Sequence, residues 1–343
     1  MEHRRTFTLP SWAVRELALV QDLIREELPV ALTPFMERAG YTLPGREPFA
    51  LRPLLLLAVA RHYGSSGDRP VRLAAAVQMI HLASLLHDRL GQPGLAAPVS
   101  GSAPEAEDDH RRESTDILLG DFLFAKASHV VIEDGDIVII EDMIRTSSQS
   151  AEAKARVLSI DEGTVPMDPR SCFEASAEKL SLLLSLSVRV GAVLAGAGRD
   201  EQDALSDFGL SLGRSLRILE DLHFWSDSGN RAIFAAAERA LTYPLLLLWE
   251  KEGREAWEGV RRELSDSPER SLSSLQIRLG RGGYLDAALL DARRQAESAA
   301  ERIDVLAPTE ARRLLQEVAR TFLFDWQLAT EESGQVSAIS SQA

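Results

Sequence analysis

Cysteine is almost absent from this chain of 343 residues, which contains only Cys172. A single thiol cannot form an internal disulfide, and it cannot supply a cysteine-rich zinc site. Such a composition is typical of proteins from a reducing compartment. We therefore interpret Cys172 as an ordinary small side chain.

Long apolar stretches are also missing. The longest runs, at residues 54–60 and 245–249, are too short to cross a bilayer. The basic N-terminus lacks the apolar run that a signal peptide needs. We expect a cytoplasmic protein without a membrane span.

Positive charge is scarce as well. The chain has 38 lysines and arginines against 52 aspartates and glutamates, which gives a formal net charge of -14. Binding to nucleic acid or to anionic lipid requires a basic surface. We therefore expect no nucleic-acid partner.

Helical periodicity dominates what is present. Apolar residues recur at a spacing of three to four along most of the chain, and even the strand-like run at residues 137–140 has helical neighbours. The fold class is therefore all-α. We expect helices at residues 11–28, 51–63, 71–90, 112–131, 141–160, 171–197, 200–225, 233–251 (broken or kinked near Pro244), 254–264, 271–279, 284–306 and 309–328.

Composition also suggests how the chain is divided. Residues 1–50 contain one amphipathic helix followed by a loop, and residues 51–330 form the helical domain. Within that domain, residues 91–109 are rich in Gly, Pro, Ala and Ser, so we expect a mobile insert. The polar residues 331–343 have no reason to fold and should form a disordered tail.

A His-Asp-Arg cluster ends the otherwise apolar helix at residues 78–90. This stretch resembles the first aspartate-rich helix of the trans-isoprenyl diphosphate synthase (polyprenyl synthetase) family. There, a similar segment runs into Asp-Asp-x-x-Asp. Here Asp88 remains, Arg89 stands in the second position and Gln92 in the last.

The resemblance continues along the chain in the family's order. Residues 118–123 are similar to the family's Leu-x-Gly-Asp-x-Leu helix, and residues 216–224 to its second aspartate-rich motif. In that second motif Glu220 and Asp221 are acidic, but Phe224 replaces the last aspartate. The resemblance implies an isoprenoid-synthase-type helical bundle around a central cavity.

The resemblance also implies where substrate would bind. Arg52, Lys179 and Arg217 correspond to positions near the family's diphosphate sites, although Arg217 stands where the family has glutamine. Ala83 and Ser84 lie one turn before the first motif, where bulky side chains close the family's prenyl tunnel. Small residues at these positions predict an open tunnel.

We expect the two altered aspartate motifs to bind magnesium poorly. The family holds the departing diphosphate with magnesium ions bound by both aspartate motifs, and magnesium prefers carboxylates and other hard oxygen ligands. Here three carboxylates are accompanied by Arg89 and Arg217, which leaves a net charge near -1. We therefore assign no metal or catalytic residue and expect Mg²⁺ only if the chain is active. The arginines could instead pair with the carboxylates in a metal-free network.

Three functions remain open. The first is a catalytically degenerate subunit that pairs with an active prenyl diphosphate synthase and tunes it. The second is an active polyprenyl diphosphate synthase with a relaxed metal site, and the third is a non-catalytic protein that binds a prenyl diphosphate. A homodimer or a heteromer with an intact synthase could form through the Gly120-Asp121 helix, whose apolar residues are Ile117, Leu118, Leu119 and Phe122.

Overall fold

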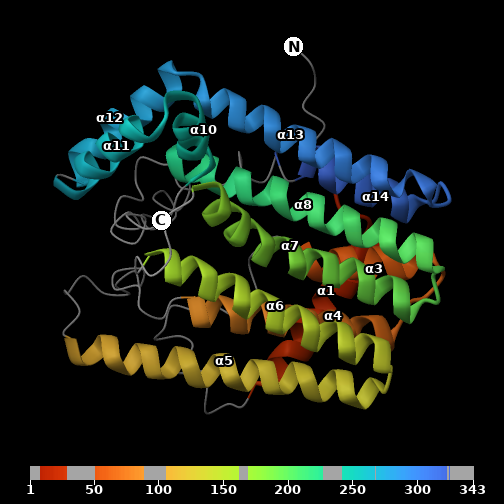
Figure 1. The fold of residues 1–343 in the computed structure, drawn as a ribbon. Coiled ribbons are helices and arrows are strands. Elements are labelled where there is room, and N and C mark those ends of the chain that lie inside the picture. The colour runs from red at the N-terminus through yellow and green to blue at the C-terminus, as the bar shows by residue number, and fades with distance from the viewer. Residues whose placement is uncertain are drawn as a thin grey trace, which may run out of the picture.

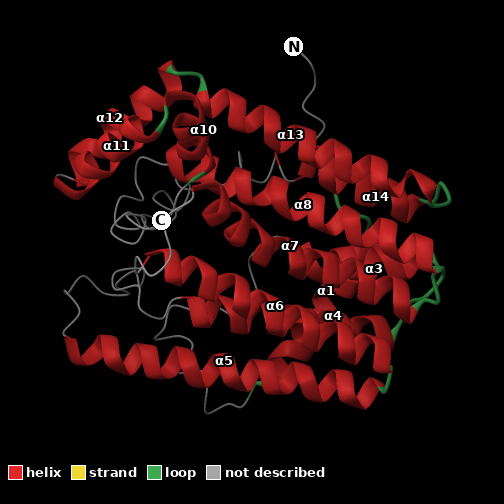
Figure 2. Cartoon of the chain, viewed as in Figure 1, coloured by secondary structure: helices red, strands yellow, loops and turns green. Residues whose placement is uncertain are grey.

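The computed structural model describes residues 8–28, 51–88, 106–161, 169–226, 242–266, 268–322 and 324. Within these ranges the secondary structure is helical and contains no strand, as Figure 2 shows. The all-α prediction is therefore confirmed. Arg89, Gln92, most of the predicted insert at 91–109 and the predicted tail at 331–343 lie outside the described residues.

The helices follow one another along the chain as Figure 1 shows. They are α1 (Ser11–Glu27), α3 (Leu51–His62), α4 (Asp68–Asp88), α5 (Ala106–Asp134), α6 (Ile137–Asp161), α7 (Pro169–Leu194), α8 (Arg199–Ser226), α10 (Tyr243–Glu252), α11 (Arg254–Asp266), α12 (Pro268–Arg281), α13 (Tyr284–Arg302), the 3-10 turn η2 (Ile303–Val305), α14 (Glu310–Glu317) and the π-helical turn η3 (Val318–Phe322).

One predicted boundary was wrong, and one strand-like run proved to be helical. α5 begins at Ala106, so residues 106–109 extend this helix and do not belong to an irregular insert. Acidic residues in a first helical turn interact favourably with the helix dipole, which explains why the acidic run joins the helix. α6 begins at Ile137, so the strand-like run at 137–140 is helical, as its neighbours indicated. Asp136 Oδ1 accepts a hydrogen bond from the backbone N–H of Val138 at 3.0 Å at this end of the helix.

Pro244 marks the start of a helix. It lies in the first turn of α10, which begins at Tyr243. A proline there lacks only an N–H that would have no partner within the helix. The break expected near Pro244 is therefore present, as the start of α10 at Tyr243.

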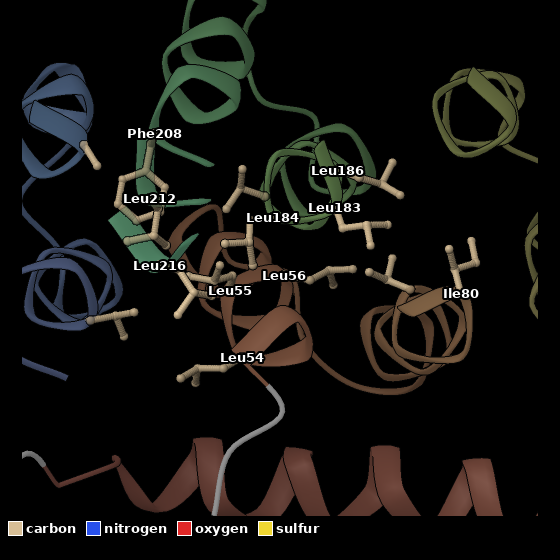
Figure 3. Close-up of a cluster of buried hydrophobic side chains, with 14 of the residues drawn as sticks. Leu54, Leu55, Leu56, Ile80, Leu183, Leu184, Leu186, Phe208, Leu212 and Leu216 are labelled. Carbon is tan, nitrogen blue, oxygen red and sulfur yellow. The ribbon is translucent and has the colours of Figure 1, made fainter. Parts of the chain in front are cut away.

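The core lies where α3, α4, α7 and α8 meet. Leu54, Leu55 and Leu56 of α3 are fully buried. Figure 3 shows Leu55 beside Leu216 of α8 and Leu56 pointing toward the side of Leu183 of α7 and Ile80 of α4. In Figure 1, α7 and α8 lie between α5 on one side and α13 with α14 on the other. This arrangement buries the apolar faces of the long central helices.

Glycines allow α7 and α8 to approach closely. A Cβ at Gly213 of α8 would overlap the Cα of Ser181 on α7, and a Cβ at Gly209 would lie 2.6 Å from the backbone nitrogen of Ser185. The two helices therefore touch through their backbones. This contact places Lys179 of α7 and Arg217 of α8 at the same end of the bundle.

The packing of α5 and α6 is different. α5 packs mainly against α4 and α6 mainly against α7, whereas α5 and α6 touch each other only slightly. Space remains between these two pairs of helices. No helix in the described part of the chain is both long and apolar enough to cross a bilayer.

Candidate functional site

Asp88, the aspartate that remains from the first motif, is held by two lysines. Lys154 of α6 donates a hydrogen bond to Asp88 Oδ1 at 2.7 Å, and Lys179 of α7 pairs with Oδ2. Lys154 also donates to the backbone carbonyl of His87 at 3.2 Å. Both carboxylate oxygens at the end of α4 therefore already have a cationic partner.

Lys154 is the residue that sequence reasoning missed. It lies 66 positions from Asp88, in a helix that resembles no motif of the family. By sequence it is one of several charged residues on an amphipathic helix, where a solvated lysine is the usual outcome. Only the packing of α6 against α7 brings it to the first motif.

The second motif is held by an arginine. Arg217 lies 2.7 Å from Asp221 Oδ1 and 3.6 Å from Glu220 Oε2. Asp221 Oδ2 accepts a hydrogen bond from the backbone N–H of Tyr243 at 2.8 Å. The pairing that the sequence left as one possibility for Arg217 is therefore present, while Arg89 lies outside the described residues.

Burial shifts the acid–base behaviour of this second cluster. It raises the pKa of Asp221 to about 6, against the opposing effects of Arg217 and the Tyr243 N–H. Burial likewise raises the pKa of Glu220, although Arg217 and Arg52 oppose this shift. Phe224, at the position of the family's last aspartate, packs partly buried against the core and adds no charge.

Arg52 lies within electrostatic reach of Glu220 in the second motif and of Lys179 beside the first. Its side chain is only 6% exposed, and burial lowers its pKa to about 10 while Glu220 opposes this shift. Its charge also lowers the pKa of Lys179 and of His81, so all of these groups lie within electrostatic reach of it. The predicted diphosphate-binding residues Arg52, Lys179 and Arg217 thus belong to one charged cluster.

The charged cluster is poorly suited to the magnesium ions that the resemblance implies. Among the described residues it contains three carboxylates, Asp88, Glu220 and Asp221, and four cationic side chains, Arg52, Lys154, Lys179 and Arg217. Cationic groups bonded to the carboxylates repel a metal ion and occupy its ligands. The described residues hold no group of three or more potential metal ligands. The donor set therefore does not fit a magnesium cluster.

A cavity of about 500 Å³ opens beside the first motif. Its charged end contains Asp88, Lys154 and Lys179, and its walls are mostly apolar or small side chains of α4, α5, α6 and α7. Its volume is within the range of ligand-binding pockets in proteins. A smaller hollow of about 50 Å³ shares Ile80, Phe124, Ile144 and Ser147 with it and extends it between α5 and α6.

Ala83 and Ser84 lie in the wall of this cavity. Both are small, so the wall remains open at the point where a larger side chain would fill it. Gly120 of α5 packs against the His87 side chain, because a Cβ at position 120 would overlap the His87 imidazole. That the cavity receives a prenyl chain stays a prediction.

The helix predicted as an interface is only partly exposed. Ile117 is 42% and Leu118 67% exposed on α5, whereas Leu119 is buried and Phe122 packs against the core. Exposed apolar side chains continue along α5 and α6. They are Phe124, Ile132, Ile137, Val138 and Ile144. We call this set, together with Ile117 and Leu118, the α5–α6 apolar face.

No family model matches the chain, but individual relatives do. It is 26% identical over 319 residues to the short chain isoprenyl diphosphate synthase of Methanothermobacter thermautotrophicus, a match that covers 88% of this chain and 94% of the relative. It is 22% identical to the octaprenyl diphosphate synthase of Haemophilus influenzae, over 83% of this chain and 87% of the relative.

Solved structures agree with these relatives. The polyprenyl synthase from Caulobacter crescentus, complexed with calcium and isoprenyl diphosphate, superposes with a TM-score of 0.74 at 28% identity, covering 91% of this chain and 95% of that one. The decaprenyl diphosphate synthase from Rhodobacter capsulatus gives a TM-score of 0.71 at 26% identity, over 90% and 95% of the two chains. Over most of its length the chain is therefore similar in sequence and fold to trans-isoprenyl diphosphate synthases (polyprenyl synthetases).

Proposed function

We propose that this protein is a subunit of a prenyl diphosphate synthase that has no prenyl-transfer activity of its own and tunes an active partner. One observation carries the proposal. The carboxylates at both motif positions are already paired with cations of the same chain, Asp88 with Lys154 and Lys179, and Asp221 with Arg217. Carboxylates held in this way are poor ligands for magnesium.

The charge of the cluster supports the same conclusion. Ionising an allylic diphosphate requires stabilisation of the departing diphosphate, which the family achieves with several magnesium ions. Those ions need a strongly negative site, but the four cations and three carboxylates counted above leave the described cluster with a net charge near +1. Such a site attracts the diphosphate itself and repels the metals that would activate it.

We infer that the partner docks on the α5–α6 apolar face. Large exposed apolar patches commonly mark protein–protein interfaces. The proposed partner is an intact prenyl diphosphate synthase, because a chain with the same fold would present a matching surface of its own. Pairing between two copies of the present chain is the competing outcome.

Turnover decides between these functions. Isopentenyl diphosphate, an allylic diphosphate and Mg²⁺ are incubated with the purified protein alone, with an intact synthase alone, and with both. We expect no product from this protein alone and a changed rate or product length in the mixture. Product from the protein alone would contradict the proposal and indicate an active synthase with a relaxed metal site.

The cavity favours one second candidate. A protein that keeps an apolar cavity of about 500 Å³ beside a cationic cluster could bind a prenyl diphosphate without acting on it or on a partner. If this second candidate is correct, the rate and product length of the mixture should equal those of the intact synthase alone, except for the effect of substrate that this protein binds. Excess substrate would remove the effect of such binding. A change in rate or product length caused by association with the synthase would persist in excess substrate.

A further inference from the structure

Lysine is rare among the cations of this chain. The sequence has 38 lysines and arginines, and only four of them are lysines, Lys126, Lys154, Lys179 and Lys251. Two of these four, Lys154 and Lys179, meet at Asp88. Arginine keeps its proton in proteins, whereas a buried lysine can release it and then react as an amine. The charged end of the cavity therefore holds the kind of cation that can become a nucleophile.

The surroundings of Lys179 favour its neutral amine. Its side chain is 19% exposed. Burial lowers the pKa of Lys179, Asp88 opposes this shift, and the charges of Lys154 and Arg52 add to it. His81 is also within electrostatic reach of Lys179, and burial keeps this histidine neutral. Removal from water and a neighbouring cation are two environments that activate lysines as nucleophiles, and Lys179 has both.

The cavity of about 500 Å³ provides room for a ligand beside this amine, because Lys179 is one of its lining residues. Four helices contribute apolar side chains to the same walls, namely Ile80, Phe124, Ile144 and Leu183. An apolar tail between these side chains would bring the group at its end to the amine. A carbonyl group at that end is uncharged, so it would not compete with Asp88 for the two lysines.

We propose that Lys179 forms an imine with an apolar aldehyde whose tail lies in the cavity. The ammonium group first releases one proton to water. The neutral nitrogen then bonds to the carbonyl carbon, and the carbonyl oxygen leaves as water with the two remaining protons of the amine. A proton returned from water gives the imine one N–H, which donates to Asp88 as its counter-ion. The step needs neither Mg²⁺ nor a partner synthase, so it goes beyond the proposed subunit function and does not depend on it.

Reductive trapping tests this step on the full-length protein. Dodecanal is added with sodium cyanoborohydride, which reduces an imine to a stable secondary amine, and peptide mass spectrometry measures the alkylated fraction of each lysine. We expect Lys179 to react at least about tenfold faster than the exposed Lys251, since burying about two methylenes of the tail supplies that factor. Excess dodecanol, which has the tail without the carbonyl, should slow the reaction of Lys179 alone. Equal reaction of the two lysines would overturn the proposal.

Lys154→Met tests the contribution of the second cation. The substitution removes a neighbouring positive charge and leaves Asp88 to Lys179 alone, and both changes favour the ammonium form of Lys179. Trapping at Lys179 should therefore slow severalfold, whereas Lys154→Arg should keep most of the rate. An equal loss in both variants, with circular dichroism showing that they are folded, would overturn the electrostatic role of Lys154. Arg156→Met is the matched control, because Arg156 is an exposed cation on the same helix that pairs with Glu178 outside the cavity.

The trapping experiment and the turnover assay fail independently. Trapping at Lys179 in a protein without turnover of its own would support both proposals. Turnover by the protein alone would refute the subunit proposal, while trapping would still decide whether Lys179 forms an imine. Alkylation of Lys154 in place of Lys179 would overturn the assignment of the nucleophile and leave the subunit proposal untouched.

Discussion

Lys154 Nζ lies 2.7 Å from Asp88 Oδ1, so a side chain of α6 holds the carboxylate that ends α4. Lys179 of α7 holds the other oxygen of the same carboxylate. The last turn of α4 is thereby tied to the two helices on the far side of the cavity. The aspartate that remains from the first motif therefore lies between two ammonium groups at one end of the cavity.

The close contact between α7 and α8 should be intolerant of a single methyl group. In Gly213→Ala the new Cβ would overlap the backbone at Ser181, so the helices must separate. We expect a loss of about 1–3 kcal/mol in the free energy of unfolding, as is typical of overpacked cores. Chemical denaturation monitored by circular dichroism would measure this loss.

Gly259→Ala is the control for that substitution. Gly259 lies inside α11, and a Cβ there meets no atom within 4 Å. Since alanine is favoured over glycine in a helix, this variant should be about 0.5–1 kcal/mol more stable than the parent protein. Equal effects at the two positions would contradict the backbone contact between α7 and α8.

His81 should make stability depend on pH. Burial lowers its pKa well below the ordinary value, and the charges of Arg52 and Lys179 lower it further. The unfolded chain then takes up a proton near pH 6.5 that the folded chain does not. The stabilising contribution of neutral His81 is therefore present above about pH 6.5 and is lost as the pH falls.

The chain has seven histidines, so the contribution of His81 must be isolated by comparison. Unfolding free energies measured between about pH 7.5 and about pH 5.5 should fall more steeply for the parent protein than for His81→Gln. In addition, Lys179→Met should raise the pKa of His81 in an NMR titration. An unchanged pKa in that variant would show that the two groups do not interact.

The size of residue 83 should control how long a ligand the cavity accepts. Ala83 is 3% exposed and lines the cavity, so Ala83→Phe would place a ring in this space. Each buried methylene contributes about 0.8 kcal/mol, so excluding about two of them should weaken binding about tenfold. We expect this loss for geranylgeranyl diphosphate but little change for dimethylallyl diphosphate.

Leu85→Phe provides the comparison for Ala83→Phe. Leu85 is on the same helix, is 42% exposed and does not line the cavity. Affinity for both ligands should be unaffected by this change. If Ala83→Phe weakened the short and the long ligand equally, the ring would be disturbing the charged end and not the tail region.

A charge on the α5–α6 apolar face should disrupt the proposed association. Leu118 is 67% exposed, and Leu118→Asp would place a carboxylate within this apolar face. Loss of a central contact of about 2 kcal/mol weakens association about thirtyfold. Sedimentation of this protein mixed with an intact synthase would measure the change in affinity.

Val305→Asp is the matched control for association. Val305 is 70% exposed in η2, close in sequence to α13 and α14 on the opposite side of the bundle from α5. The two substitutions add the same charge at equally exposed apolar positions. If both variants associate like the parent protein, the partner must bind another surface.

The sequence by itself determined the fold class and the resemblance to the polyprenyl synthetases. Helical spacing of apolar residues is a local property, and it remains visible in α4 and α7 even where nearly every side chain is buried. The two altered aspartate motifs could also be recognised from the sequence, because each is a short pattern within a single helix. Boundaries were less certain, as Ala106 showed, since the ends of a helix depend on a few capping contacts.

Tertiary structure decided the chemistry of the site. Lys154 and Asp88 are 66 positions apart, and no spacing within either helix predicts that they meet. The burial of Arg52 without a partner for its Nε in the described structure, and the cavity among α4, α5, α6 and α7, likewise arise from how helices pack. Periodicity specifies which face of a helix is buried, but the neighbour that covers this face is set by the assembled bundle.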